Sequence, residues 1–226
     1  MRNAEITVFW IKLARSVKKF SFGVTTIFFF AVWAFAQTPK TILLDADGNR
    51  LTDNEFVDLR LANRVKDLAT RTILDDGTIQ LKLGRVPQEG TPAPPFDAAT
   101  INGKFLKAGD LKGKVVVFNF WFIGCPGCME ELPKLNSLAA KYHDNGNVQF
   151  IAVAPNTAQE LRQFLAQQKF DYQMIGSGTS VIDLFNFIGF PRNIVIGKDG
   201  KIVYWRTTVR AWDKFDSVIQ AELDKN

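Results

Sequence analysis

The stretch that contains both cysteines constrains the fold of this chain more than any other. Residues 115–120 read Val-Val-Val-Phe-Asn-Phe, a nearly unbroken apolar and β-branched run that is typical of a central strand covered on both faces. A Cys-Pro-Gly-Cys motif at 125–128 follows, and apolar residues then recur on one helical face. Pro133 interrupts this helical pattern and predicts a kink. Both cysteines are therefore expected where a buried strand becomes a helix.

The C-terminal half of the chain predicts an alternation of strands and helices. Short apolar runs indicate buried strands, and apolar residues at helical spacing indicate the helices between them. A Gly-Lys-Asp-Gly turn at 197–200 is typical of a hairpin. Crossover helices join parallel strands and a hairpin joins antiparallel ones, so we expect an α/β domain with a central mixed sheet and helices on both faces. The expected elements after the cysteine motif are strands at 148–153, 194–196 and 202–204 and helices at 157–168, 181–187 and 212–223.

The first 36 residues have the composition of a targeting segment. Five Lys and Arg residues and one Glu precede an uncharged, largely apolar run from Phe20 to Ala36. The ending Ala34-Phe35-Ala36 has small residues at the spacing that signal peptidase accepts, which favours a cleaved signal peptide. The run is also about as long as the shortest transmembrane helices, so an uncleaved N-terminal membrane anchor is the rival interpretation. Both interpretations export the rest of the chain.

A proline-rich stretch at 92–95 divides the remaining residues. Such a composition resists regular structure and commonly marks a boundary. We therefore expect the main domain to span 91–226, with 37–90 as a small N-terminal extension to which the sequence assigns no role. The elements expected in the extension are a hairpin within 40–56, a short helix over 56–68 and a strand over 78–83.

Charge and cysteine content exclude two classes of protein. The formal charge of +5 comes mostly from the targeting segment, so the remainder is nearly neutral. It lacks the clustered Lys and Arg of a nucleic-acid-binding surface, and no nucleic-acid partner is expected. Two cysteines are too few for a disulfide framework or a four-thiolate zinc site.

The spacing of Cys125 and Cys128 suits thiol–disulfide exchange. One thiolate attacks a substrate disulfide, and a second thiol nearby resolves the mixed disulfide. The positive end of the helix dipole favours a thiolate at Cys125, so Cys125 is expected to attack and Cys128, deeper and less exposed, to resolve. Glu131, on the next helical turn, is the candidate proton relay if it is partly buried with a raised pKa. A purely electrostatic role for Glu131 is the alternative, and the neighbouring Glu130 is expected to face solvent.

Several segments are similar to those of a known family. The residues flanking the cysteines, at 118–121 and 131–133, resemble the thioredoxin superfamily and look TlpA/ResA-like. The resemblance covers residues 91–226 and implies a thioredoxin-like fold and thiol:disulfide oxidoreductase activity without a bound cofactor. Three further segments support it: Pro94-Pro95-Phe96, Leu111-Lys112-Gly113-Lys114, and Gly189-Phe190-Pro191 leading into Asn193–Ile196 and Asp199-Gly200-Lys201.

The resemblance also implies roles for individual residues. It implies that Pro191 is a cis proline beside the cysteines and that the backbone of Phe190 pairs with a bound substrate as a short added strand. It assigns proton transfer to Glu131, and Asn119 replaces the buried Asp of ordinary thioredoxins. Trp121 is a candidate for a substrate-docking surface near the cysteines, although an aromatic residue at a strand end also suits the core.

Two positions depart from the pattern of this branch. Gly124 stands where Trp usually precedes the first cysteine, and Gly127 stands where Pro usually precedes the second. Residues around and between the cysteines tune the reduction potential. That the protein acts as a reductase is therefore implied only by its resemblance to the TlpA/ResA-like branch.

Export implies a bacterial periplasm, with protein disulfides as substrates. Because the periplasm is kept oxidising, electrons are expected from a membrane-embedded thiol donor. A thiolate copper chaperone on the same fold is the alternative function, but such sites recruit further His or Cys ligands and the chain has one histidine, His143. A peroxiredoxin-like peroxidase is disfavoured, because Phe122 stands where that class has Thr or Ser.

Overall fold

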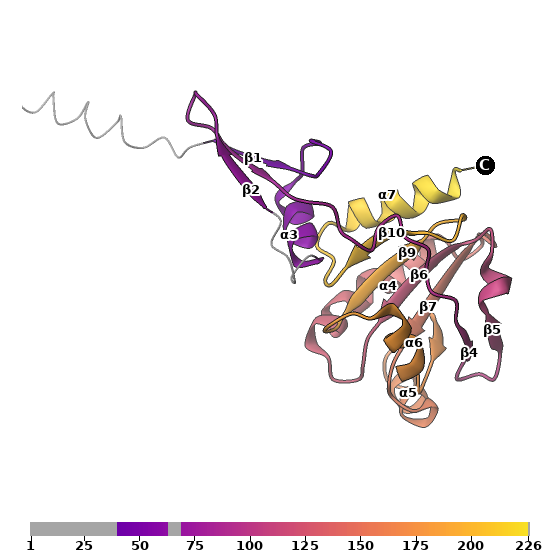
Figure 1. The fold of residues 1–226 in the computed structure, drawn as a ribbon. Coiled ribbons are helices and arrows are strands. Elements are labelled where there is room, and N and C mark those ends of the chain that lie inside the picture. The colour runs from indigo at the N-terminus through magenta and orange to yellow at the C-terminus, as the bar shows by residue number, and fades with distance from the viewer. Residues whose placement is uncertain (1–39, 63–68, 226) are drawn as a thin grey trace, which may run out of the picture. The chain divides into compact units, whose positions relative to one another are not determined.

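The structure is a computed structural model that describes residues 40–62 and 69–225 (Figure 1). The predicted targeting segment at 1–36 lies outside the described residues. Within the described ranges, no helix is long and apolar enough to span a bilayer.

A five-stranded sheet forms the centre of the main domain (Figure 1). Its strand order is β10-β9-β6-β7-β8, with β6, β7 and β8 parallel and β9 and β10 antiparallel to their neighbours. This confirms the predicted mixed sheet. Only β8 was missed, because three residues are too few for a periodicity signal. The strands are β6 (Val115–Phe120), β7 (Val148–Val153), β8 (Gln173–Ile175), β9 (Arg192–Ile196) and β10 (Ile202–Arg206).

Helices cover both faces of this sheet, as predicted. Alternate residues of β6 point to opposite faces, so Val115 and Val117 join one buried cluster and Val116 and Phe118 join the other. The first cluster takes its helical residues from α4, α5 and α7, and the second from α6. The helices are α4 (Pro126–Lys141), α5 (Ala158–Leu165), α6 (Thr179–Phe185) and α7 (Trp212–Leu223).

A small hairpin and a short helical turn precede the sheet. Strands β4 (Asp97–Ala99) and β5 (Phe105–Lys107) pair antiparallel, and the 3₁₀ turn η2 (Ala108–Leu111) follows them. These elements were not predicted from the sequence, because each is a single short turn or a three-residue strand.

The extension forms a separate three-stranded sheet with one helix. Strand β3 (Ile79–Lys82) lies between β1 (Thr41–Leu44) and β2 (Thr70–Ile73), parallel to the first and antiparallel to the second. The prediction of a hairpin within 40–56 is therefore wrong in its pairing. The turn exists, but its second arm ends after an isolated bridge at Arg50.

The reason is a helix start that was not predicted from the sequence. Thr52 and Glu55 form a reciprocal capping pair, in which the backbone N–H of Thr52 donates to Glu55 at 2.8 Å and the N–H of Glu55 donates to the Thr52 hydroxyl at 3.3 Å. This pair starts helix α3 (Asp53–Ala62) immediately after the turn. No residues then remain for a second strand.

Helix α3 packs onto the main domain beside β10. Leu59 and Ala62 contact the buried cluster on the α6 face, and the hydroxyl of Thr207 lies 3.4 Å from the carbonyl of Leu61. Asp58, on the same helix, is 1% exposed. The extension is thus joined to the end of the sheet through its helix.

Candidate active site

Cys125 caps the N-terminus of α4, directly after β6. Its Sγ accepts a hydrogen bond from the backbone N–H of Cys128 at 3.3 Å, and Pro126 occupies the first helical turn, where its missing N–H costs nothing. The unpaired N–H groups and the helix dipole at this end stabilise negative charge on the sulfur. The local structure therefore favours a thiolate at Cys125.

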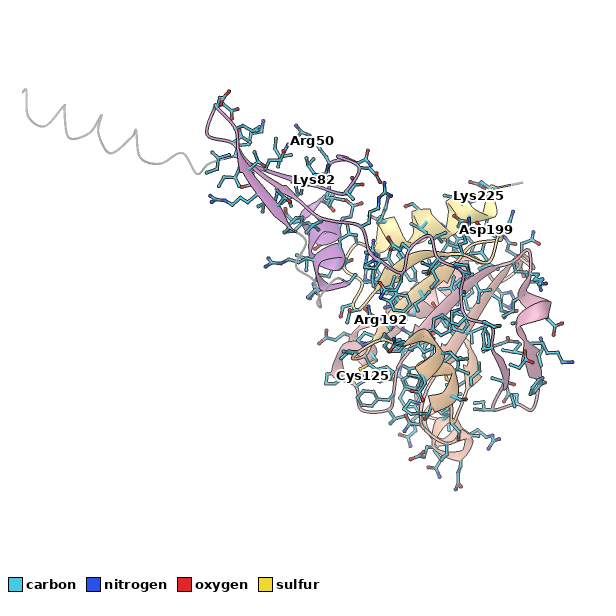
Figure 2. All side chains as sticks on the ribbon, in the orientation of Figure 1. Arg50, Lys82, Cys125, Arg192, Asp199 and Lys225 are labelled. Carbon is cyan, nitrogen blue, oxygen red and sulfur yellow. A yellow bond between two sulfur atoms is a disulfide. The ribbon has the colours of Figure 1, made fainter. Side chains whose placement is uncertain are left out.

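The two cysteines form a disulfide with a Cα–Cα separation of 5.3 Å. Both residues are 3% exposed, so the expected difference in exposure between Cys125 and Cys128 is absent in this disulfide-bonded state. In Figure 2 Cys125 lies at one end of the domain, and Asp199 and Lys225 lie at the other. An apolar pocket of about 600 Å³ that Asp199 helps to line is therefore not part of this site.

Pro191 lies against the cysteine motif, and the Phe190–Pro191 peptide bond is cis, as the family resemblance implies. A Cβ atom placed on Gly127 would lie 3.4 Å from Cδ of Pro191, so the backbone at Gly127 lies close to the ring of Pro191. Phe190 is half-buried, and its ring meets that of Phe122 edge-on at 5.4 Å between centroids. The structure thus brings Phe190 and Pro191 beside the motif.

Trp121 does not lie on the surface. It is fully buried, with its ring 5.0 Å from that of Phe164 and 5.3 Å from that of Phe170. The expectation that Trp121 forms part of a docking surface is therefore wrong in this structure. It follows β6 into the cluster under α4, as an aromatic residue at the end of a buried strand commonly does.

Gly124 explains one departure from the family pattern. Its φ is +89°, in the left-handed region that side chains rarely adopt, although the space around it is open. A tryptophan at this position would strain this backbone. The loop into Cys125 therefore takes a path that depends on glycine.

Replacing Gly124 with alanine is expected to lower the free energy of unfolding by roughly 1–2 kcal/mol, because alanine is strained at positive φ. Denaturant unfolding of the oxidised protein measures this. Gly146→Ala is the matched control, since Gly146 also has open space but no positive φ, and it should be neutral or slightly stabilising. Equal effects at both positions would contradict the assigned role of Gly124.

Glu131 is a buried acid at the centre of a hydrogen-bond chain. Its Oε2 accepts from Nδ2 of Asn193 at 2.9 Å and its Oε1 accepts from the backbone N–H of Val209 at 2.6 Å. Asn193 in turn accepts from Nδ2 of Asn119 at 2.9 Å. The two asparagines are register partners on β9 and β6 and share the face of the sheet that α4 covers. The strand period thus places this amide pair next to Glu131.

Burial raises the pKa of Glu131 from 4.5 to about 7, against the opposing effects of the hydrogen bonds from Asn193 and Val209. The nearby charge of Asp58 raises this pKa further, and Arg210 lowers it. A carboxyl with this pKa exists in both protonation states near neutral pH, which is what a proton relay requires. Glu130, by contrast, is exposed, as expected.

Three partners of Glu131 were missed in the sequence. Asn193 lies in a segment of the family resemblance but was given no role, and Val209 contributes only a backbone N–H. Asp58 lies in the extension, far away in the sequence. A signal was available only for Asn193, because an amide inside an apolar strand run, like Asn119 in β6, indicates a buried partner.

The described part of the chain contains no group of three or more His, Cys, Asp or Glu residues placed to hold a metal ion. His143 lies on the surface, with its side chain 83% exposed and 2.9 Å from Asp144. His143 therefore adds no metal ligand to the cysteine pair.

This chain is similar in sequence to a known family and to characterised proteins. Residues 88–221 match the Redoxin family. The thiol-disulfide oxidoreductase ResA of Bacillus cereus is 36% identical over 118 residues, which cover 51% of this chain and 68% of that protein. The ResA protein of Halalkalibacterium halodurans is 30% identical over 138 residues, which cover 59% of this chain and 78% of that protein.

Solved structures show the same fold. The crystal structure of a thiol:disulfide interchange protein of the thioredoxin family from Chlorobium tepidum superimposes with a TM-score of 0.53 at 25% identity, covering 59% of this chain and 96% of that one. The cysteine pair, the cis proline and the mixed sheet thus occur in a chain whose relatives in sequence and structure are thiol–disulfide exchange proteins. The chain belongs to the Redoxin family, as a TlpA/ResA-like member of the thioredoxin superfamily, and is a thiol:disulfide oxidoreductase.

Proposed function

We propose that this oxidoreductase is a reductase of protein disulfides outside the cytoplasmic membrane, with Cys125 and Cys128 as its redox centre. One observation best supports the assignment of the redox centre. A cysteine at a helix N-terminus is bonded to a second cysteine on the same helix, with the buried acid Glu131 one turn further on. The chemistry resides in the predicted domain at 91–226.

In the proposed cycle the thiolate of Cys125 attacks one sulfur of a substrate disulfide. A bond forms between the two sulfurs, and the other substrate sulfur leaves as a thiolate. The thiol of Cys128 then transfers its proton to Glu131 and attacks Cys125, which releases the second substrate sulfur. The substrate gains two electrons and, in water, two protons. The protein ends with the Cys125–Cys128 disulfide.

The substrate chain is proposed to lie in an extended form beside Pro191 and to pair with the backbone of Phe190. The close approach between Pro191 and Gly127 supports this, because a chain at Phe190 is then also near the cysteines. The half-buried rings of Phe122 and Phe190 offer apolar contact area next to the backbone. Main-chain pairing would give affinity without a fixed substrate sequence.

The targeting composition of residues 1–36 supports export to a periplasm, as a cleaved or membrane-anchored protein. Once oxidised there, the cysteine pair must be reduced again. A membrane-embedded thiol donor is the proposed source, because that compartment has no cytosol-like reducing pool.

The direction of electron transfer is tested by the equilibrium reduction potential. The full-length chain is purified in mild detergent and titrated against dithiothreitol. A potential near that of thioredoxin, roughly −270 mV, is expected for a reductase. A value near roughly −120 mV would make the protein an oxidant instead. A preparation with no two-electron couple and stoichiometric bound copper would favour the metal-carrier alternative.

A further inference from the structure

Asp58 is a buried acid that belongs to the extension, outside the domain that carries the cysteines. It is 1% exposed, while most of the surface of α3 around it is exposed or half-buried. Its Oδ2 accepts hydrogen bonds from two successive backbone N–H groups, of Arg210 at 2.8 Å and of Ala211 at 2.9 Å. Its Oδ1 lies 3.7 Å from Nη1 of Arg210. A buried carboxylate is costly, so this arrangement calls for an explanation beyond packing.

The segment that Asp58 binds is also the segment that binds Glu131. Residues 209–211 connect the end of β10 to the start of α7, and α3 lies beside them (Figure 1). The N–H of Val209 donates to Glu131 at 2.6 Å, and the next two N–H groups donate to Asp58. Three consecutive backbone donors thus hold two buried acids, one from the extension and one from α4.

We propose that Asp58 is a positioning residue for Glu131: it fixes residues 209–211, keeps the Val209 N–H on Glu131, and places a second acidic side chain next to the proton relay. The inference rests on the proposed function, because it deepens the role of Glu131 in that cycle. It also gives residues 37–90 a purpose. The extension completes the proton-transfer site.

The charged and titratable groups around Glu131 determine in which direction its pKa changes when Asp58 is replaced. Asp58 on α3 raises the pKa of Glu131, while Arg210 in the connecting segment lowers it. Tyr172, before β8, and Tyr204, on β10, also interact with Glu131, and both have raised pKa values because they are buried. Both tyrosines stay neutral near pH 7, so among the residues that the structure describes Asp58 and Arg210 are the charges that act on Glu131 there.

The burial of Asp58 raises its own pKa, and the hydrogen bonds from Ala211 and Arg210 oppose this. Arg206 and Arg210 also favour its charged form. Removing the charge of Asp58 while keeping an acceptor oxygen should therefore make Glu131 easier to ionise. Removing the acceptor as well should free residues 209–211 and loosen the Val209 contact.

Two variants of the full-length chain separate these effects. Asp58→Asn keeps an acceptor for the N–H groups of Arg210 and Ala211, and Asp58→Ala does not. The primary readout is the titration of the Glu131 carboxyl by ¹³C NMR on glutamate-labelled protein, assigned by its loss in Glu131→Gln. In Asp58→Asn we expect the Glu131 midpoint to move to lower pH by about half a pH unit. The pH profile of disulfide exchange should move with it.

Asp58→Ala is expected to slow the resolution of the mixed disulfide by about tenfold, because the relay is no longer held in place. In the Glu131→Gln background neither Asp58 variant should change the exchange rate or its pH profile further. Asp53→Asn is the matched control, because Asp53 lies on the same helix with the same charge but is exposed, and it should change neither readout.

An unchanged Glu131 midpoint in Asp58→Asn, or an equal shift in Asp53→Asn, would overturn the inference. If Asp58→Ala does not fold, Asp58→Asn still decides the question. The proposed function fails in a different way. In that case the wild-type protein exchanges no disulfides, but the NMR midpoint of Glu131 still shifts in Asp58→Asn. That outcome supports the link between the two acids and removes only its catalytic purpose.

Discussion

Replacing Cys125 with serine is expected to reduce the rate of protein-disulfide reduction by at least about 10³-fold, because no other thiolate stands at the helix N-terminus. Replacing Cys128 with serine is expected to leave the first attack intact and to stop the second. The protein should then accumulate as a mixed disulfide with its substrate. Non-reducing electrophoresis and mass spectrometry of the reaction with a disulfide-containing protein measure both results.

This pair of variants decides which cysteine attacks. Because both cysteines are equally buried in the oxidised state, exposure alone does not distinguish them. The distinction rests on the position of Cys125 as the helix cap and on the N–H of Cys128 that points at its sulfur. If Cys125→Ser formed the stable mixed disulfide and Cys128→Ser did not, the two roles would be reversed.

Glu131→Gln is expected to slow disulfide exchange by about 10²-fold, because the resolving thiol loses its proton acceptor. In the wild-type protein the rate should also depend on pH with a midpoint near 7, the pKa to which burial raises this carboxyl. The midpoint should disappear in the variant. Stopped-flow measurement of exchange between pH 5 and pH 9 provides the test, and the exposed neighbour Glu130→Gln is the matched control.

The pH dependence of the free energy of unfolding also reports the pKa of the Glu131 carboxyl. Its pKa is higher in the folded protein than its ordinary value of 4.5, so the folded state binds the proton more tightly than the unfolded state does. The contribution of Glu131 to the free energy of unfolding is therefore fully present below pH 4.5 and is lost as pH rises through about 7. The loss amounts to about 3 kcal/mol. A flat difference between wild type and Glu131→Gln across this range would refute the raised pKa.

The sequence predicted the centre of the fold and the cysteine pair well. The run at 115–120 and the helix after Cys125 carry long, consistent periodic patterns, and both elements form where expected. Elements of three residues, such as β8, carry no such pattern. The hairpin expected within 40–56 failed because the capping pair of Thr52 and Glu55 starts a helix there.

The surroundings of Glu131 were much less predictable. Its own burial was a condition of the relay hypothesis and not a prediction. Asn193 and Val209 are distant in the sequence and come together with Glu131 only through the strand order of the sheet. A backbone donor such as Val209 has no residue-type signal at all. The contact of Asp58 with residues 210 and 211 depends on how the extension packs, which no local pattern encodes.

The glycines beside the two cysteines have a consequence for selectivity. A Cβ atom at Gly124 would meet no atom within 4 Å, and one at Gly127 would meet Cδ of Pro191, so neither position places a side chain beside the disulfide. Without side chains at these two positions, the site has fewer contacts with which to discriminate between the residues that flank a target cystine. Discrimination then depends on the conformation of the target, because the proposed pairing with the backbone of Phe190 requires the target cystine to lie in an extended segment. Such an enzyme would act on incompletely folded clients and spare the disulfides of finished proteins.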